Sequence, residues 1–294
     1  MASATHDSWS TWLLDRRFGG DRAQYDEMMR FLAPVRERLL DNAQLREGDV
    51  VLDVGCGDGL IAFGALDRVG DTGRVIFLDV SEELLERART LAEQAGVAER
   101  CEFVHAAAPD LRMLTDSSVD VVTTRSVLIY VPDKQRAFDE FHRALRPGGR
   151  VSAYEPINSY AYPEPGNLFL GYDVTPVRRL ADRVKRVYEA IDVPERNAMQ
   201  DFDERDLVRF AETAGFPEVR VELELQVKPL AGRDDWDATE NRSGNPFVPT
   251  PREAIEQALS PQEAERFRAY LRPLAAAGAG KYRFAVAYLT AVKP

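Results

Sequence analysis

The pattern of apolar and polar positions changes at about residue 48. Before it, apolar residues at helical spacing predict helices over 8–14 and 22–40, separated by the stretch RRFGGD. After it come five short β-rich runs without strict polar alternation: DVVLDV, RVIFLDV, CEFVHA, VDVVTT and RVSAYEPI. Strands with this pattern are covered on both faces. The change predicts an N-terminal helical cap over residues 1–47, followed by a buried sheet.

Helical patterns separate these strands, over 60–68, 81–95 and 134–145. Ser81 is placed to cap the second helix. Alternation of strands and helices produces right-handed crossovers and a parallel sheet. A helix over 204–214, a strand over 219–227 and the closing run KYRFAVAYLTAVK extend the order. The predicted fold class is α/β: a doubly wound, mostly parallel seven-stranded sheet with helices on both faces.

Two irregular segments interrupt this order, at about 158–200 and 229–280. The first contains YAYPEPGNLFLGY and the second contains NPFVPT. We interpret both as insertions near the active-site mouth, within one domain over residues 48–294. Aromatic residues in a covering segment often line an apolar pocket. The insertions are therefore predicted to form a substrate cover.

Composition limits the partners that the chain can bind. Its 294 residues are 45% hydrophobic and 30% charged, with a formal net charge of −11. Scattered basic residues among more numerous acids argue against a nucleic-acid partner and favour a small-molecule substrate. No apolar run approaches the ~20 residues that span a bilayer, and the N-terminus lacks a signal pattern. We expect a cytoplasmic protein without membrane insertion, as a monomer or a homodimer.

The stretch VVLDVGCGDGL places Gly55, Gly57 and Gly59 between a strand and a helix, where doubly wound sheets bind ligands. The dinucleotide spacing requires a glycine at position 60, which is leucine here. Asp53 ends the strand and Asp58 lies in the loop. Two carboxylates repel a pyrophosphate, which normally lies against a helix N-terminus. They suit a ligand that carries positive charge.

Asp79 ends the next strand, about 20 residues past the glycines, where an acidic side chain accepts ribose hydroxyls. The pocket thus requires a ribose, close backbone approach and a cation. S-adenosylmethionine, with its sulfonium and ammonium groups, meets all three requirements. A nicotinamide-dependent oxidoreductase is a less favoured alternative because of Leu60 and Asp53.

Four segments together resemble the class I (Rossmann-like) S-adenosylmethionine-dependent methyltransferases of the small-molecule type: VLDVGCGDG, VIFLDVS, SVDVVTTRSVLIYVPD and AFDEFHRALRPGGR. The resemblance covers about residues 48–157. It implies that the glycine loop faces the methionine part of the cofactor. It also implies that Asp79 holds the ribose, with Val80 beside it.

The resemblance also assigns the adenine and methionine ends of the pocket. The adenine-binding stretch of the family falls on VHAAAPDL. Ala107 replaces an Asp that many members use to bind the adenine amino group, so the resemblance leaves the Ala108 backbone N–H to contact the adenine. Arg125 and Ser126 match positions whose backbone reaches the methionine amino group. The predicted cofactor-binding residues are therefore Asp53, Gly55, Gly57, Gly59, Asp79, Val80, Ala107, Ala108, Arg125 and Ser126.

The implied reaction is direct in-line methyl transfer to an oxygen, nitrogen or carbon of a small organic molecule. Most of its catalysis can come from orienting the acceptor and excluding water, and a base is needed only for an acceptor that keeps its proton. Glu155 and Tyr130 are the candidate catalytic residues, although Glu155 could equally pair with Arg125 and shape the wall. The candidates for substrate contact are Arg125, Tyr130, Asn158, Tyr160 and Tyr172.

Several alternatives stay open at this point. Relatives that methylate arsenic use several cysteine thiolates, and the two cysteines here argue against that chemistry. A protein of this fold could instead catalyse a non-methylating reaction such as a cyclisation. A quinone-like aromatic acceptor follows only from family analogy. Arg16, Arg17 and Phe18 are predicted to form a lid over the cofactor carboxylate, and no metal site is predicted.

Overall fold

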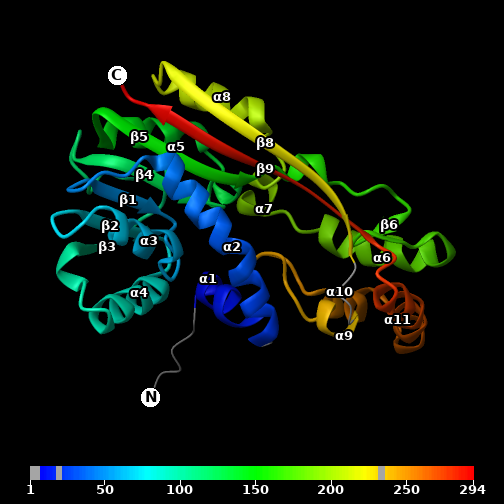
Figure 1. The fold of residues 1–294 in the computed structure, drawn as a ribbon. Helices are drawn as coiled ribbons and strands as arrows, with labels where there is room; N and C mark the ends of the chain where they lie inside the picture. The colour runs from blue at the N-terminus through cyan, green and yellow to red at the C-terminus, as the bar shows by residue number, and fades with distance from the viewer. Residues whose placement is uncertain (1–6, 18–21, 231–235) are drawn as a thin grey trace. The chain divides into compact units, whose positions relative to one another are not determined.

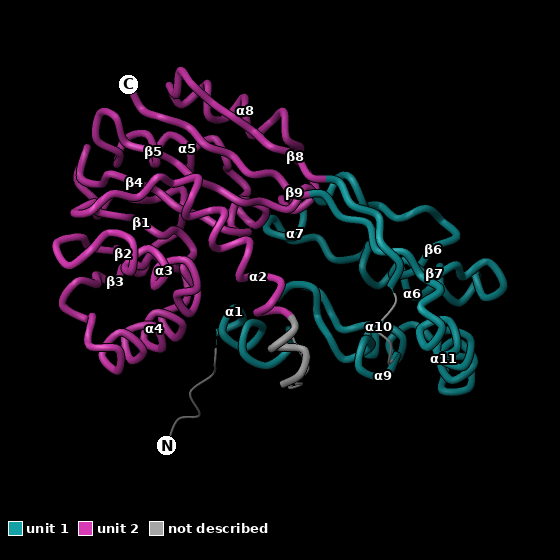
Figure 2. The backbone as a smooth tube through the Cα atoms, in the orientation of Figure 1, with its two compact units in different colours: residues 1–26, 158–197, 225–285 teal, residues 27–157, 198–224, 286–294 magenta. Residues whose placement is uncertain are grey.

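The computed structural model describes residues 7–17, 22–230 and 236–294 (Figure 1). No helix in these ranges is long and apolar enough to cross a membrane. The chain divides into two compact units, which Figure 2 colours separately. The sheet unit comprises residues 27–157, 198–224 and 286–294, and the insertion unit comprises 1–26, 158–197 and 225–285. Most of both predicted insertions therefore belongs to a single unit.

A seven-stranded sheet with the order β3-β2-β1-β4-β5-β9-β8 organises the fold (Figure 1). Its strands are β1 (Val50–Val54), β2 (Arg74–Asp79), β3 (Cys101–His105), β4 (Val119–Arg125), β5 (Leu145–Pro156), β8 (Glu218–Pro229) and β9 (Lys281–Val292). Strands β1 to β5 pair in parallel, and β9 is antiparallel to β5. The predicted sheet is confirmed. Val54 lies beside Leu78 of β2 and Thr124 of β4, so three strands end together at one edge.

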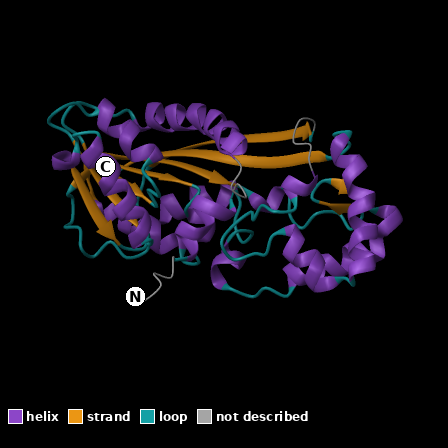
Figure 3. Cartoon of the chain, turned by 90° about the horizontal axis from the view of Figure 1, so that it is seen from below, coloured by secondary structure: helices purple, strands orange, loops and turns teal. Residues whose placement is uncertain are grey.

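Helices lie on both faces of this sheet (Figure 3). The helical elements of this part of the chain are α2 (Arg22–Ala43), α3 (Leu60–Arg68), α4 (Glu82–Gln94), η2 (Ala98–Arg100), η3 (Leu128–Tyr130), α5 (Lys134–Ala144) and α8 (Glu204–Thr213). The predicted cap of α4 is present, since the Ser81 hydroxyl accepts the Leu84 N–H at 3.1 Å. Asp203 begins α8 with a capping box. Polar N-caps thus mark the starts of α4 and α8, whereas α3 begins after Gly59 without a side-chain cap.

From Glu27 on, helix α2 is part of the sheet unit rather than of a separate cap. The Ser152 hydroxyl of β5 donates to the Leu39 carbonyl at 2.7 Å, and the Arg150 Nε donates to the Ala43 carbonyl at 3.0 Å. Leu39 and Leu40 are buried. The predicted cap over residues 1–47 is therefore divided, because the apolar face of α2 is covered by the sheet.

The insertion unit has its own hydrophobic core. Its elements are α1 (Ser8–Thr11), the π-helix η1 (Trp12–Arg16), η4 (Asn158–Tyr160), β6 (Leu168–Phe169), β7 (Tyr172–Asp173), η5 (Thr175–Val177), α6 (Arg178–Glu189), α7 (Pro194–Ala198, ending one residue past the unit), α9 (Trp236–Thr239), α10 (Pro251–Ala258) and α11 (Pro261–Ala276). Phe169 and Val184 come from the first insertion, Trp236 and Phe267 from the second, and all four are buried in one cluster. The two insertions thus share one packed core, and their role as a substrate cover stays a prediction.

The described part of the N-terminal segment packs within this unit. The Trp12 indole donates to the Ser243 carbonyl at 2.9 Å, and the Ser243 N–H donates to the Arg16 carbonyl at 3.1 Å. Trp9 lies edge-on to Phe247 with 5.4 Å between ring centroids. Phe18, part of the predicted lid, lies outside the described residues.

Candidate functional site

The glycine loop after β1 has a backbone that only glycine adopts readily. Gly55, Gly57 and Gly59 have φ angles of 66°, 56° and 95°, in the left-handed region. A Cβ on Gly55 would lie 2.2 Å from a methyl carbon of Val127. The loop thus needs glycine at position 55 for two reasons, its conformation and the close approach of the segment after β4.

Asp79, at the end of β2, holds the loop from the other side. Its carboxylate accepts the Gly57 N–H at 2.8 Å and the Ser81 N–H at 2.9 Å, and the side chain is 7% exposed. The Leu78 carbonyl accepts the N–H groups of Gly55 and Cys56. The structure therefore brings Asp79 to the glycine loop, as the sequence predicted, and leaves the neighbouring Val80 exposed at the edge of the sheet.

Asp53 lies beneath the loop with 1% of its surface exposed. Its Oδ1 accepts the Thr123 hydroxyl at 2.7 Å, whereas Oδ2 has no hydrogen-bond partner. Burial raises the pKa of Asp53 to about 7, although the Thr123 hydrogen bond and the charge of Arg125 oppose this shift. A buried carboxyl with an unsatisfied oxygen is costly unless a ligand compensates it.

The predicted adenine stretch follows β3 and has one exposed and one buried alanine. Ala107 is exposed and accepts the Asp110 N–H at 2.9 Å through its carbonyl, whereas Ala108 is 4% exposed. The His105 imidazole lies 3.0 Å from the Val80 carbonyl and 3.1 Å from Glu82. His105 thus joins the end of β3 to the residue that was predicted to flank the ribose.

Arg125 and Ser126 end β4 beside the loop. Ser126 has a φ angle of 57°, and its N–H donates to the Tyr154 carbonyl at 2.7 Å. The Arg125 guanidinium is half-buried and makes no hydrogen bond or ion pair with another described residue. Its charge lowers the pKa of both Asp53 and Glu155, which places it near both carboxyls.

The hydrogen bonds of Glu155 go to the backbone of the turn after β4 and not to the Arg125 guanidinium. The side chain is 0% exposed, and its oxygens accept the backbone N–H groups of Val127, Leu128 and Ile129 at 3.0, 3.0 and 3.2 Å. Burial raises the pKa of Glu155 to about 7 against the pull of these donors. In this arrangement its lone pairs serve the backbone and are turned away from any substrate. Tyr130, at the end of the same turn, is half-buried and remains a candidate for acceptor contact.

The other predicted substrate residues belong to the insertion unit. The Asn158 carbonyl accepts the N–H groups of Ala161 and Tyr162, and Tyr160 is 43% exposed. Tyr172 is 3% exposed and lies edge-on to Trp236 at 6.3 Å. Tyr172 thus packs the core of its unit, which leaves no free ring face for a substrate.

Two residues that shape the site were missed from sequence. Thr123 pairs with Asp53, and Val127 contacts Gly55. The signal for Thr123 was a pair of threonines directly after buried valines in β4. Nothing in the sequence pattern indicated Val127, because its contact depends on the turn that Glu155 holds.

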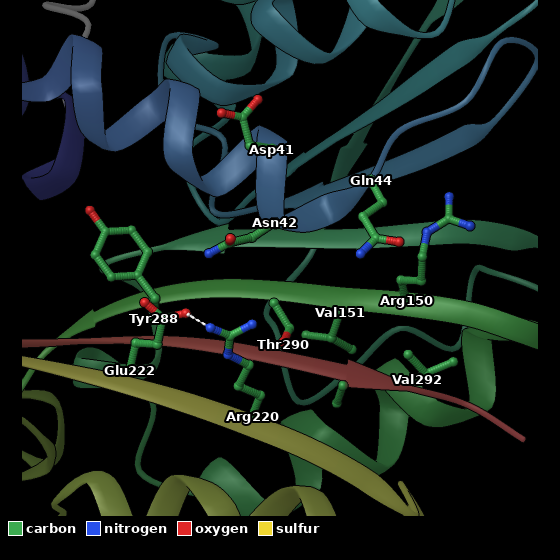
Figure 4. Close-up of a pocket in the computed structure, with 11 residues that line it drawn as sticks. Asp41, Asn42, Gln44, Arg150, Val151, Arg220, Glu222, Tyr288, Thr290 and Val292 are labelled. Atoms are coloured by element: carbon green, nitrogen blue, oxygen red, sulfur yellow. Dashed lines mark ion pairs between the residues drawn. The ribbon is translucent and has the colours of Figure 1, made fainter.

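A separate hollow of about 150 Å³ lies in the sheet unit, away from this loop. Figure 4 shows it between the end of α2 and the strands β5, β9 and β8. Arg150 and Val292, which line it, are paired across β5 and β9. Since Arg150 lies beside Val121 in the first half of β4, the hollow is at the amino ends of the parallel strands. The glycine loop lies at their carboxyl ends.

Comparison with known proteins gives the class. The sequence model of a family described as "Methyltransferase domain" matches residues 45–168. A demethylmenaquinone methyltransferase of Staphylococcus aureus is 31% identical over 192 residues, which cover 63% of this chain and 75% of that protein. An arsenite methyltransferase of Halobacterium salinarum is 37% identical over 122 residues, which cover 42% of this chain and 31% of that protein. This chain therefore belongs to the class I S-adenosylmethionine-dependent methyltransferase family.

A solved structure agrees on the fold. Phosphoethanolamine N-methyltransferase 2 of Haemonchus contortus has a TM-score of 0.54 at 19% identity, and the match covers 89% of this chain and 53% of that one. The chain spans only 31% to 55% of the length of three of the curated relatives it matches. Their whole-protein activities do not transfer to this chain by likeness alone.

Proposed function

We propose that this protein binds S-adenosylmethionine at the carboxyl edge of its parallel strands and transfers the methyl group to a small organic molecule. The observation that carries this proposal is the arrangement of Asp79 and the three left-handed glycines around one loop. Such a loop leaves backbone atoms bare for close contact, and a carboxylate at the end of the neighbouring strand suits ribose hydroxyls.

The residues present fit the cofactor. Asp53 has a buried carboxylate oxygen without a hydrogen-bond partner. Glu155 is a second buried carboxyl, and the charge of Arg125 lowers the pKa of both groups. A positive ligand nearby favours the charged form of both carboxyls. Arg125, without an anionic hydrogen-bond partner in the described part of the chain, is suited to a carboxylate. The site thus offers complementary charge for both ends of an amino acid and for a sulfonium.

When bound, S-adenosylmethionine supplies a methyl group on positively charged sulfur. The sulfur is a good leaving group because it departs as a neutral thioether. The residues of this chain then have three tasks: to hold the cofactor, to orient the acceptor and to exclude water. Asp79 holds the ribose, the glycine loop contacts the methionine part, and Tyr130 is proposed to contact the acceptor. Val80, Ala107 and Ala108 are proposed to border the adenine.

The cysteines favour an organic acceptor over arsenite. The chain has two cysteines. Cys56 follows the carboxyl end of β1, whereas Cys101 begins β3 at the opposite end of the parallel strands. Burial raises the pKa of both thiols, which disfavours the thiolates that bind arsenic. We therefore propose an acceptor of the quinone-like aromatic type, the kind that the name of the staphylococcal relative indicates.

The test is calorimetric titration of the full-length protein with S-adenosylmethionine and, separately, with NAD. We expect binding of the first only. In Asp79→Ala the affinity should fall by at least about tenfold, the value of one hydrogen bond to a charged group. Asp67→Ala, an exposed aspartate on α3, is the matched control and should bind normally. Binding of NAD instead would end the proposal.

Turnover separates methyl transfer from other chemistry on the same fold. A demethylated quinone and arsenite are supplied as acceptors in separate reactions, and S-adenosylhomocysteine is measured in each. Accumulation of S-adenosylhomocysteine with the quinone supports the proposed reaction. If S-adenosylmethionine binds and stays intact while the organic substrate is consumed, the protein catalyses a non-methylating reaction such as a cyclisation.

A further inference from the structure

Glu155 is a buried carboxyl whose hydrogen bonds all go to one short turn. It receives the N–H groups of three consecutive residues, Val127, Leu128 and Ile129. These residues begin η3, where backbone N–H groups lack partners within the turn. A carboxylate that accepts all three replaces the missing partners and fixes the turn relative to β5.

This turn also touches the glycine loop. Val127 is the residue whose side chain would meet a Cβ on Gly55, at 2.2 Å for its nearest methyl carbon. On its other side the loop is held by the Leu78 carbonyl and the Asp79 carboxylate. The loop thus lies between two supports. One is formed by the end of β2, and the other by Val127 on a turn anchored by Glu155.

We propose that Glu155 is a positioning residue: its carboxylate holds the Val127–Ile129 turn against Gly55 and so sets the wall of the cofactor site. This proposal rests on the proposed function for its ligand, and on hydrogen bonds and packing for its mechanism. It replaces the predicted role of Glu155 as a base, because both carboxylate oxygens are engaged by the backbone. It also explains why a strand end facing a binding edge carries a carboxyl that no solvent reaches.

The electrostatic surroundings agree with this role. Arg125 is the charged group that acts on Glu155, and it favours the carboxylate form, as do the three N–H donors. Burial acts in the opposite direction and brings the pKa of Glu155 to about 7. By linkage, a pKa raised in the fold means that ionisation of Glu155 costs stability, and this cost appears as the pH rises through about 7.

The first experiment measures amide hydrogen exchange at Val127, Leu128 and Ile129 in the full-length protein without ligand. In Glu155→Gln the side chain keeps its size but one oxygen becomes an NH2 group, which cannot accept. We expect exchange of at least one of these amides to rise by about tenfold, the value of one hydrogen bond to a charged group. Affinity for S-adenosylmethionine should fall by a similar factor, about tenfold. Unchanged exchange would overturn the proposal.

The matched control is Glu240→Gln. Glu240 is 1% exposed and is paired with Arg252 and Arg268 in the insertion unit. This variant also loses a buried carboxylate, so it measures general destabilisation. We expect a lower melting temperature with unchanged exchange at 127–129 and unchanged cofactor affinity. A loss of affinity equal to that of Glu155→Gln would show that destabilisation alone explains the effect.

A second variant keeps the proposal testable if Glu155→Gln fails to fold. Val127→Ala retains all three N–H groups but shortens the contact with Gly55. It should weaken S-adenosylmethionine binding by about threefold or more, as expected for a lost buried contact of about 0.8 kcal/mol, with amide exchange at 128 and 129 unchanged. Unchanged affinity would refute the link from the turn to the loop. If the wild-type protein fails to bind S-adenosylmethionine, the proposed function fails, and the exchange experiment still decides whether Glu155 holds the turn.

Discussion

The two units bury carboxylates in opposite ways. In the insertion unit, Glu240 is enclosed by two guanidinium groups, those of Arg252 and Arg268, each at 2.7 Å. In the sheet unit, Asp53 and Glu155 have only hydroxyl and backbone N–H groups as hydrogen-bond partners. Burial raises the pKa of both Asp53 and Glu155 to about 7. The charge of Glu240 is therefore compensated by its two arginines, whereas Asp53 and Glu155 still favour a nearby cation.

This difference separates a structural buried charge from a functional one. An ion pair compensates its own desolvation when the geometry is good. A carboxyl that has only neutral donors retains part of its desolvation cost, and a positive ligand can offset that cost on binding. The sheet unit therefore carries buried carboxyls without ion-pair partners at the edge where we propose that the cofactor binds, whereas the buried carboxylate of the insertion unit is paired.

The largest expected effect tests whether the insertion unit has a core of its own. Trp236 is 1% exposed within that core, so Trp236→Ala should cost about 3–5 kcal/mol. We expect a new low-temperature transition in calorimetry of the full chain. Cofactor affinity measured below that transition should stay at the wild-type value, because the candidate cofactor residues lie in the sheet unit.

Trp236→Phe is the control for this change. The Trp236 Nε1 is buried without a hydrogen-bond partner, so phenylalanine removes ring volume but no hydrogen bond. We expect it to be clearly milder than alanine, at about 1–2 kcal/mol. A single cooperative transition in both variants, with affinity falling in step, would mean that the two cores unfold together.

The second expected effect concerns pH and the two carboxyls of the sheet unit. The ordinary pKa of glutamate is 4.5, and that of Glu155 in the fold is about 7. Between these values the folded state binds more protons than the unfolded state, so stability falls as the pH rises. For each of Asp53 and Glu155 we expect a loss of about 2 kcal/mol between pH 5 and pH 8. Urea denaturation at intervals of one pH unit measures it.

Variants isolate these carboxyls from the other titrating groups. Asp53→Asn and Glu155→Gln should each flatten the pH dependence relative to the wild type. Glu240→Gln should leave it unchanged. S-adenosylmethionine should also bind more tightly as the pH rises from 6 to 8, and S-adenosylhomocysteine, which lacks the sulfonium charge, should respond less. Parallel pH profiles in all three variants would contradict the comparison of the two units.

The sequence predicted the sheet well because its signals are local and regular. A few neighbouring residues are enough to recognise the covered strands, the Ser81 cap and the order of strand and helix. The meeting of Asp79 with the glycine loop was also predictable, since parallel strands end at one edge. These features follow from periodicity and topology alone.

The remainder depends on contacts between distant, irregular segments. Tyr172 was expected at a substrate, but it packs against Trp236, which is 64 positions later in the chain. Glu155 was expected at a substrate or on Arg125, yet it binds the backbone of residues 127–129, and no side-chain pattern encodes such a partner. The boundary of the helical cap was missed because α2 hydrogen-bonds to β5 through its carbonyl groups.

The smallest expected effect concerns Arg16, which was predicted to lie over the cofactor carboxylate. In the structure it pairs with Glu253 of its own unit at 2.6 Å, with side chains 35% and 53% exposed. Glu253 also accepts the Thr250 N–H at 2.8 Å, so it retains a partner in Arg16→Ala. Because exposed ion pairs contribute about 0–1 kcal/mol, we expect a small, salt-dependent loss of stability and no change in S-adenosylmethionine affinity. Trp12→Phe, which removes the hydrogen bond to Ser243, should cost about 1 kcal/mol at any salt concentration. An affinity that falls more than about threefold in Arg16→Ala alone would instead favour the lid, because a free energy of that size exceeds half a kcal/mol and would require a contact with the ligand.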